Sequence, residues 1–248
     1  MLDNRASFDT FDIHPAIKQG LIDSGHYRAT PIQEMAISQK NRAALLLLSP
    51  SGTGKTCAFS ILMLNRILQK TGQHLNSQPK GFINGLVLAP SPELCQQISK
   101  EMQLIGRHIP LSIFPIISSI KLEEDWQEIN HTHIVVATPG IALKLIMKKK
   151  LKMSSSLITV VIDEWDKMLS DEGLNANLTS LFSRSYTLPN QIICSSATYS
   201  QDAYVKLNHI LFLKWHLIKS VLGPDVVLPN LSSELIDSSV MPATVTVD

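Results

Sequence analysis

The chain has 248 residues, of which 44% are hydrophobic and 17% are charged, and its formal net charge is +1. This length suits one large α/β domain with a single hydrophobic core, and the composition is that of a globular protein. A nearly neutral chain has no general attraction to polyanions, so any site for nucleic acid must be local.

The sequence lacks the features of a membrane or exported protein. No apolar run approaches the length of a membrane span, and the polar N-terminus leads into no apolar signal segment. Cys57, Cys95 and Cys194 lie far apart and have no metal-ligand spacing. We therefore expect reduced cysteines, no membrane partner and an intracellular location, either cytoplasmic or nuclear.

Helical and strand patterns alternate along the chain. A first helix is predicted over residues 13–24, and a second begins at Pro31 with Thr30 as its N-cap. Strands are then predicted over residues 43–48, 86–89, 111–116, 134–137, 157–162, 191–195 and 214–218. Helices are predicted between them over residues 57–68, 92–106, 122–129, 141–147, 174–182 and 201–207. This alternation predicts an α/β fold of three layers, with a mainly parallel sheet and ligands at the carboxyl ends of its strands.

A phosphate-binding loop follows the strand at residues 43–48. Its sequence is Ser49-Pro50-Ser51-Gly52-Thr53-Gly54-Lys55-Thr56. The backbone N–H groups of such a turn and the positive end of the next helix bind an anion together. In this pattern Lys55 places a cation at the β and γ phosphates, and Thr56 supplies a hydroxyl ligand for Mg²⁺. The first position of the pattern is usually Gly and is Ser49 here, yet the strand before it and the helix after it disfavour a chance match.

Two adjacent carboxylates, Asp163 and Glu164, follow the strand at residues 157–162. The simplest reading is a solvated acidic start of a helix. Beside a phosphate loop the pair has a second interpretation, in which Asp163 holds Mg²⁺ and Glu164 orients or deprotonates the attacking water. We favour this second interpretation because the strand that precedes the pair is apolar.

Six segments occur in an informative order. They are residues 25–33 (Gly-His-Tyr-Arg-Ala-Thr-Pro-Ile-Gln), 49–56, 90–94 (Pro-Ser-Pro-Glu-Leu), 138–140 (Thr-Pro-Gly), 163–166 (Asp-Glu-Trp-Asp) and 196–198 (Ser-Ala-Thr). In this order and spacing they resemble the first RecA-like domain of the DEAD-box ATP-dependent RNA helicases, over about residues 8–218. The resemblance implies a RecA-like α/β/α domain that binds ATP and Mg²⁺ and acts on RNA.

The resemblance also implies roles for single residues. Gln33 would read the adenine edge and Phe8 would pack on the base. The loop residues that would bind ATP are Ser51, Gly52, Thr53, Gly54, Lys55 and Thr56. Lys55, Asp163 and Glu164 would form the catalytic set. Asp166 would accept hydrogen bonds from Ser196 and Thr198 and so couple the ATP state to domain closure.

Several positions depart from the family pattern. The family has an arginine where this chain has Pro92, within the segment 90–94, and another where it has Ile141, directly after the segment 138–140, and the family's Gly-Gly element is Ser118-Ser119 here. Because these elements touch the RNA backbone in the family, we expect weakened RNA contacts. Trp165 replaces a small alanine, and its indole must either find room in the domain or protrude towards a partner domain.

The family's second RecA-like domain, which supplies an arginine finger, has no counterpart here. We expect it in a missing part of the chain or in trans. The sequence divides into an N-terminal flank with the adenine motif (residues 1–40), an ATP-binding domain (41–222) and an exit linker or tail (223–248). The favoured function couples ATP binding and hydrolysis to RNA binding or remodelling. The alternative is a degenerate helicase-like module that binds nucleotide or serves as a scaffold in protein or ribonucleoprotein assembly, without unwinding.

Overall fold

The computed structural model describes residues 5–72, 82–117, 129, 131–152, 157–184, 189–212 and 221–222. Its helices are η1 (Phe8–Thr10), α1 (Pro15–Asp23), α2 (Pro31–Ser38), α3 (Lys55–Thr71), α4 (Pro92–Ile105), α6 (Pro139–Met147), α7 (Trp165–Ser170), α8 (Glu172–Arg184) and α9 (Gln201–Phe212). Its strands are β1 (Ala44–Leu48), β2 (Gly85–Leu88), β3 (Ile113–Ile116), β4 (Ile134–Ala137), β5 (Thr159–Asp163), β6 (Gln191–Ser196) and β7 (Val221–Leu222).

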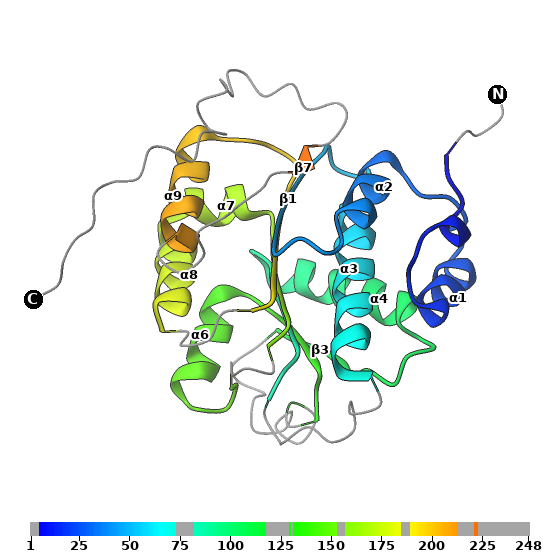
Figure 1. The fold of residues 1–248 in the computed structure, drawn as a ribbon. Coiled ribbons are helices and arrows are strands. Elements are labelled where there is room, and N and C mark those ends of the chain that lie inside the picture. Colours follow the sequence, from blue (N-terminus) through cyan, green and yellow to red (C-terminus); the bar gives the residue numbers. More distant parts are fainter. Residues whose placement is uncertain are drawn as a thin grey trace, which may run out of the picture.

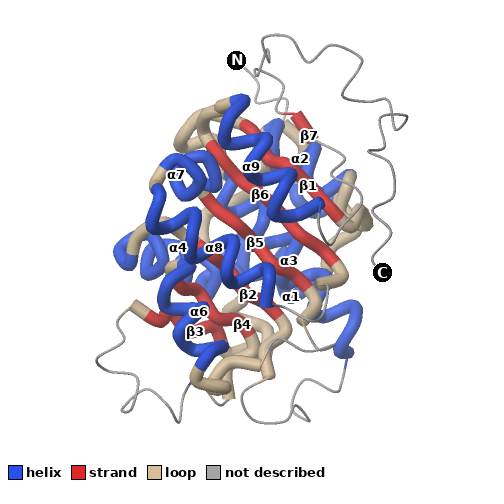
Figure 2. The backbone as a smooth tube through the Cα atoms, turned by 90° about the vertical axis from the view of Figure 1, so that its left-hand side faces the viewer, coloured by secondary structure: helices blue, strands red, loops and turns tan. Residues whose placement is uncertain are grey.

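The strands form one sheet in the order β3-β4-β2-β5-β6-β1-β7, and every pairing between them is parallel. Helices α1 to α4 cover one face, and α6 to α9 cover the other (Figure 1). Figure 2 shows α6, α8 and α9 in front of the strands and α3 behind them. The predicted α/β architecture of three layers with a parallel sheet is therefore confirmed.

The core divides at the sheet because successive side chains of a strand point to opposite faces. In β1, Leu45 and Leu47 join the cluster under α1 to α4, whereas Leu46 and Leu48 join the cluster under α6 to α9. All five residues of β1 are buried. A strand that is covered on both faces has a continuous apolar sequence, which explains why this segment was predicted as a strand from the sequence.

The structure differs from the predicted elements in η1, in α7 and at the start of α3. The sequence patterns predicted neither η1 nor α7, and α3 begins at Lys55 instead of residue 57. The predicted edge strand at residues 214–218 and most of the predicted helix at 122–129 fall outside the described residues, as do Ser118, Ser119 and the tail from residue 223. The edge position next to β1 is taken by β7, which pairs with it through residues 221 and 222.

The N-terminal flank packs on the rest of the domain. Ile17 and Leu21 of α1 and Ile32 of α2 lie in the same core cluster as α3 and α4. At the crossing of α1 and α4, a Cβ atom on Gly20 would overlap the backbone carbonyl oxygen of Ile105. The flank and the ATP-binding domain therefore share one core cluster, and the division at residue 40 stays a prediction. No helix in the described part of the chain has the length and apolar character needed to cross a membrane.

We predict that Gly20→Ala lowers the free energy of unfolding by about 1–3 kcal/mol, because the added methyl group meets backbone that cannot rotate away. Gly173→Ala in α8 is the matched control, since the heavy atom nearest to its added Cβ would be Asp171 Oδ1, at 3.4 Å. The control should be neutral or gain up to about 1 kcal/mol from helix propensity. Urea denaturation of both variants measures the difference, and equal effects would contradict the tight crossing.

Candidate nucleotide-binding site

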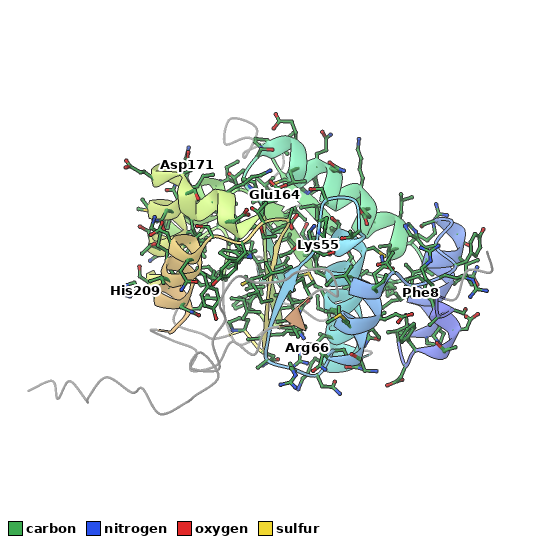
Figure 3. All side chains as sticks on the ribbon, turned by 90° about the horizontal axis from the view of Figure 1, so that it is seen from above. Phe8, Lys55, Arg66, Glu164, Asp171 and His209 are labelled. Atoms are coloured by element: carbon green, nitrogen blue, oxygen red, sulfur yellow. The ribbon has the colours of Figure 1, made fainter. Side chains whose placement is uncertain are left out.

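The site lies at the carboxyl edge of the sheet. Helices α3 and α4, which follow β1 and β2, cover one face, whereas α6, α7 and α9, which follow β4, β5 and β6, cover the other. The loops after β1 and β6, which are neighbouring strands, therefore leave the sheet in opposite directions. In open α/β sheets a crevice of this kind is where ligands bind. Figure 3, seen from above, shows Lys55 and Glu164 near one another in the middle of the molecule.

The phosphate loop has the backbone that an anion site needs. Gly52 and Gly54 have φ angles of 77° and 93°, which side chains with a Cβ rarely adopt. Gly54 is the N-cap of α3, and as a glycine it has no side chain that could cap the helix. The first N–H groups of α3 therefore lack a side-chain cap, and this arrangement fits a phosphate group.

Lys55 lies inside the loop. Its Nζ donates hydrogen bonds to the carbonyl oxygens of Ser49, at 2.5 Å, and Pro50, at 2.8 Å. Burial lowers the pKa of Lys55, while the negative charges of Asp163, Glu164 and Asp166 act in the opposite direction. The ammonium group is thus held between the loop and the acidic residues, where a phosphate would replace backbone carbonyls as its partner.

Ser49 stands where the pattern usually has Gly, and it adds a side-chain bond to the loop. Its side chain is buried, and its Oγ donates to Thr53 Oγ1 at 2.7 Å. Thr53 Oγ1 in turn donates to the carbonyl oxygen of Pro50 at 2.8 Å. Sequence reasoning treated Ser49 as a departure and missed this internal bracing of the loop.

Helix α2 is tied directly to the phosphate loop. Gln33, which is 2% exposed, donates from Nε2 to the carbonyl oxygen of Gly54 at 3.2 Å and accepts at Oε1 from the N–H of Thr30 at 2.8 Å. Thr30 Oγ1 donates to the carbonyl oxygen of Thr53 at 2.8 Å. A Cβ on Gly54 would overlap Gln33 Nε2, so the contact requires glycine. These two bonds use one N–H and one oxygen lone pair of the Gln33 amide, which has a second of each for another partner. Recognition of adenine by Gln33 stays a prediction.

Phe8 lies away from the centre of the site. Its ring is 2% exposed within the core cluster, and its centroid is 6.3 Å from that of Phe11. Figure 3 places Phe8 to the side of Lys55, together with η1 and α1. Packing of Phe8 on a base stays a prediction. It requires that one face of the ring, which is buried in this structure, become exposed.

The two carboxylates after β5 differ in their surroundings. Asp163 is 5% exposed, and burial raises its pKa to about 6, with a further contribution from the negative charge of Glu164. Glu164 has a left-handed backbone with φ of 51° and precedes α7 as its N-cap. Its carboxylate pairs with Lys167 at 2.8 Å, a contact that sequence reasoning missed although the two residues are one helical turn apart.

The donor set fits Mg²⁺ that is shared with a phosphate. Among the described residues, no cluster of three or more His, Cys, Asp or Glu side chains could hold a metal by itself. Mg²⁺ in proteins is usually held by one or two carboxylates together with phosphate oxygens and water. Thr56 and Asp163 can supply a hydroxyl and a carboxylate at this edge, and their role as ligands stays a prediction.

Of the two hydrogen bonds predicted between the acidic motif and residues 196–198, one is formed. Thr198 Oγ1 donates a short hydrogen bond to Asp166 Oδ2. The bond predicted from Ser196 to Asp166 is not formed among the described residues. The Ser196 hydroxyl accepts from the N–H of Thr198 at 3.2 Å, in the turn after β6. Their role in domain coupling stays a prediction.

The comparisons with known proteins agree with this geometry. The model of the DEAD/DEAH box helicase family matches residues 30–206, which is more than half of the chain. The chain belongs to the DEAD/DEAH box helicase family. It is 30% identical over 207 residues to eukaryotic initiation factor 4A of Caenorhabditis elegans, covering 83% of this chain and 48% of the relative. It is 34% identical over 171 residues to ATP-dependent RNA helicase DBP5 of Ajellomyces capsulatus, covering 68% of this chain and 33% of the relative.

Solved structures of DEAD-box proteins share the fold. A variant of S. cerevisiae Dbp5 bound to RNA and ADP BeF3 has a TM-score of 0.69 and 26% identity, with 82% of this chain and 49% of that chain covered. A DEAD box protein of the hyperthermophile Methanococcus jannaschii has a TM-score of 0.72 at 20% identity and covers 88% of this chain and 56% of that chain. The predicted RecA-like fold is confirmed. The chain spans about half the length, or less, of the curated relatives it matches.

Within this DEAD-box domain, the departures from the family pattern have visible consequences. Trp165 finds room in the domain: it is fully buried in the cluster under α6 to α9. Pro92 occupies the first turn of α4, with Ser91 as N-cap. Ile141 is partly buried against the same cluster as Trp165. Neither Pro92 nor Ile141 offers a cation to a phosphate, and the resulting loss of RNA affinity stays a prediction.

The buried carboxyl of Asp163 predicts a pH-dependent stability. Because the folded-state pKa lies near 6 and above the ordinary value of 3.8, the folded state favours the neutral acid. The contribution of the neutral Asp163 carboxyl to the free energy of unfolding is fully present below pH 4. It is lost as the pH rises through 6, and the loss is at most about 3 kcal/mol. Asp163→Asn should therefore match the wild type near pH 4 and exceed it in unfolding free energy at pH 8, in the absence of nucleotide.

Urea denaturation between pH 4 and pH 8 measures this difference. Asp202→Asn is the control, because the Asp202 side chain is 75% exposed and its removal should change stability little at any pH. A constant gap between wild type and Asp163→Asn across the range would show that burial of the carboxylate carries no free energy.

Proposed function

We propose that the chain is the ATP-binding lobe of a divergent DEAD-box RNA helicase, which couples ATP binding and hydrolysis to RNA binding or remodelling together with a second RecA-like domain. The observation that carries the proposal is the convergence of the uncapped start of α3, Lys55 and the buried Asp163 at one edge of the sheet. The family membership and the RNA-bound relative support it. An intracellular location, cytoplasmic or nuclear, remains part of the proposal.

Different residues of this chain would bind phosphate, hold Mg²⁺ and activate water. The N–H groups of the loop and of the first turn of α3 bind phosphate, and Lys55 exchanges its bonds with Ser49 and Pro50 for bonds with phosphate oxygens. Bound Mg²⁺ would neutralise charge on the phosphates. Asp163 and Thr56 are the side chains that would hold it. Glu164 orients the attacking water and accepts its proton, for which its ion pair with Lys167 must open.

A scaffold role without hydrolysis is the second candidate. It is favoured by Pro92 and Ile141, which stand where the family has arginines that contact RNA. The braced phosphate loop supports the ATP-binding role instead, because a module that binds no nucleotide has no need of the contact between Gln33 and Gly54. Nucleotide binding separates the ATP-binding role from a scaffold that binds no nucleotide, and ATP turnover together with a second RecA-like domain separates it from a module that binds nucleotide without hydrolysing it.

We predict that the chain binds ATP and ADP in a Mg²⁺-dependent manner and that Lys55→Ala greatly weakens this binding, since the variant lacks the cation that faces the phosphates. Isothermal titration calorimetry measures it. Lys70→Ala is the matched control, because Lys70 is exposed in the last turn of the same helix. Binding heat that is unchanged in Lys55→Ala would remove the assignment of that lysine, and no heat from the wild type would favour the scaffold role.

We also predict little ATP turnover by residues 1–248 alone. The segments that line the crevice, residues 49–56, 163–166 and 196–198, contain no arginine to stabilise charge on the transferred phosphate. An arginine finger in related enzymes accelerates phosphoryl transfer by about three to five orders of magnitude. Steady-state phosphate release, with and without a separately added second RecA-like domain, tests this. Full turnover by the chain alone would show that the catalytic set is complete without an arginine from elsewhere.

A further inference from the structure

One stretch of this nearly neutral chain is strongly basic. Residues 129–162 contain no Asp or Glu and no arginine, but they contain five lysines, Lys144, Lys148, Lys149, Lys150 and Lys152. With His neutral, this stretch carries a charge of +5, whereas the whole chain carries +1. The positive charge is thus concentrated in the segment that runs from β4 through α6 towards β5.

The fold places these lysines at the edge of the sheet opposite the nucleotide site. Helix α6 starts two residues after β4 ends, so its N-terminus lies at the carboxyl edge and its C-terminus at the amino edge. Lys152 forms an isolated parallel bridge with Phe82, which precedes β2 at the amino edge. In Figure 1, α6 lies low in the molecule and α7, which contains the second half of the acidic motif, lies high.

Four of the lysines form what we call the amino-edge patch: Lys144, Lys148, Lys149 and Lys152. All four are exposed. Within the described residues none of them has an ion pair, and the one ring contact recorded for them is that of Lys152 Nζ, 4.9 Å from the centre of the Phe82 ring. Lys144 in the last turn of α6 and Lys148 at its C-cap are four residues apart, a spacing at which like charges repel each other. The patch therefore has no described acidic partner to neutralise it.

Lys149 holds a backbone conformation that glycine adopts more easily. Its φ is 55°, and the bonds from Lys149 N to Ile146 O and from Lys150 N to Leu145 O close the end of α6. At the equivalent end of α1 the left-handed position is Gly25, with φ of 79°. A lysine is thus present where glycine would be less strained. The helix dipole accounts for a cation in the last turn of α6 but not for Lys152, which lies beyond it.

We propose that the amino-edge patch binds the phosphate backbone of RNA, at a site separate from the nucleotide crevice. Lysine is depleted at protein–protein interfaces, whereas flexible ammonium groups are suited to phosphates as point charges without sequence preference. RNA is therefore favoured over an acidic protein segment. The choice of RNA as the polyanion rests on the proposed function. Because the patch and the crevice lie at opposite edges, changes in the patch leave nucleotide binding unaltered.

The test is a salt titration of the binding of a labelled oligouridylate to the full chain, without nucleotide. For a single strand, each phosphate contact contributes about 0.7 to the slope of log affinity against log salt. The double variant Lys148→Ala with Lys149→Gly should therefore reduce the slope by about 1.4. The control, Lys100→Ala with Lys206→Ala, removes the same charge from α4 and α9 and should leave the slope unchanged. An equal slope in wild type and patch variant would overturn the proposal.

A second measurement separates binding from stability. The single variant Lys149→Gly relieves the left-handed backbone, so its midpoint of thermal unfolding should rise while its RNA affinity falls. A lysine that only closes the helix would not weaken RNA binding when replaced. If polyglutamate binds the wild type but not the patch variant, while oligouridylate binds neither, the partner is an acidic protein and the proposal is wrong. Calorimetry with ATP on the same variants tests the proposed function separately. A loss of ATP binding in the wild type would count against the proposed function, whereas an unchanged RNA slope in the patch variant would count against the patch.

Discussion

Every paired strand of this domain runs in the same direction, and both faces of the sheet are covered by helices. The strands must therefore stay apolar along their length, and polar residues emerge together where the strands end. Ser49 follows Leu48 at the end of β1, and Asp163 follows Ile162 at the end of β5. The parallel sheet thus gathers phosphate loop, acidic motif and Ser196 at one edge, and the chemistry of the domain depends on it.

The site holds a buried carboxyl group, Asp163, and a half-buried ammonium group, Lys55. Burial raises the pKa of Asp163 and lowers that of Lys55, so each group is disfavoured in its charged form. A phosphate anion beside Lys55 and a divalent cation beside Asp163 would both reverse this effect. The loop is meanwhile braced by Gln33 and Thr30, so its shape precedes any ligand. A rigid backbone with uncompensated charges is what a preorganised nucleotide site requires.

Charge is distributed unevenly between the two edges of the sheet. The carboxyl edge carries the adjacent carboxylates, whereas the amino edge carries the exposed lysines at the end of α6. Pro92 and Ile141 lie in first turns of helices at the carboxyl edge and bring no cation there. An RNA contact that moved to the amino edge would place polyanion binding and nucleotide binding on separate surfaces of one lobe.

The sequence by itself determined the alternation of helices and strands, the phosphate loop and the family, because these depend on local periodicity and on residues that are close in the chain. The tertiary structure alone decided where isolated side chains lie. Helix α7 is short and its motif is polar, so no period revealed it, and the burial of Trp165 depends on the room that α8 and α9 leave. The contact of Gln33 with Gly54 and the burial of Phe8 in the core join segments that are distant in sequence, and no local pattern encodes such distances.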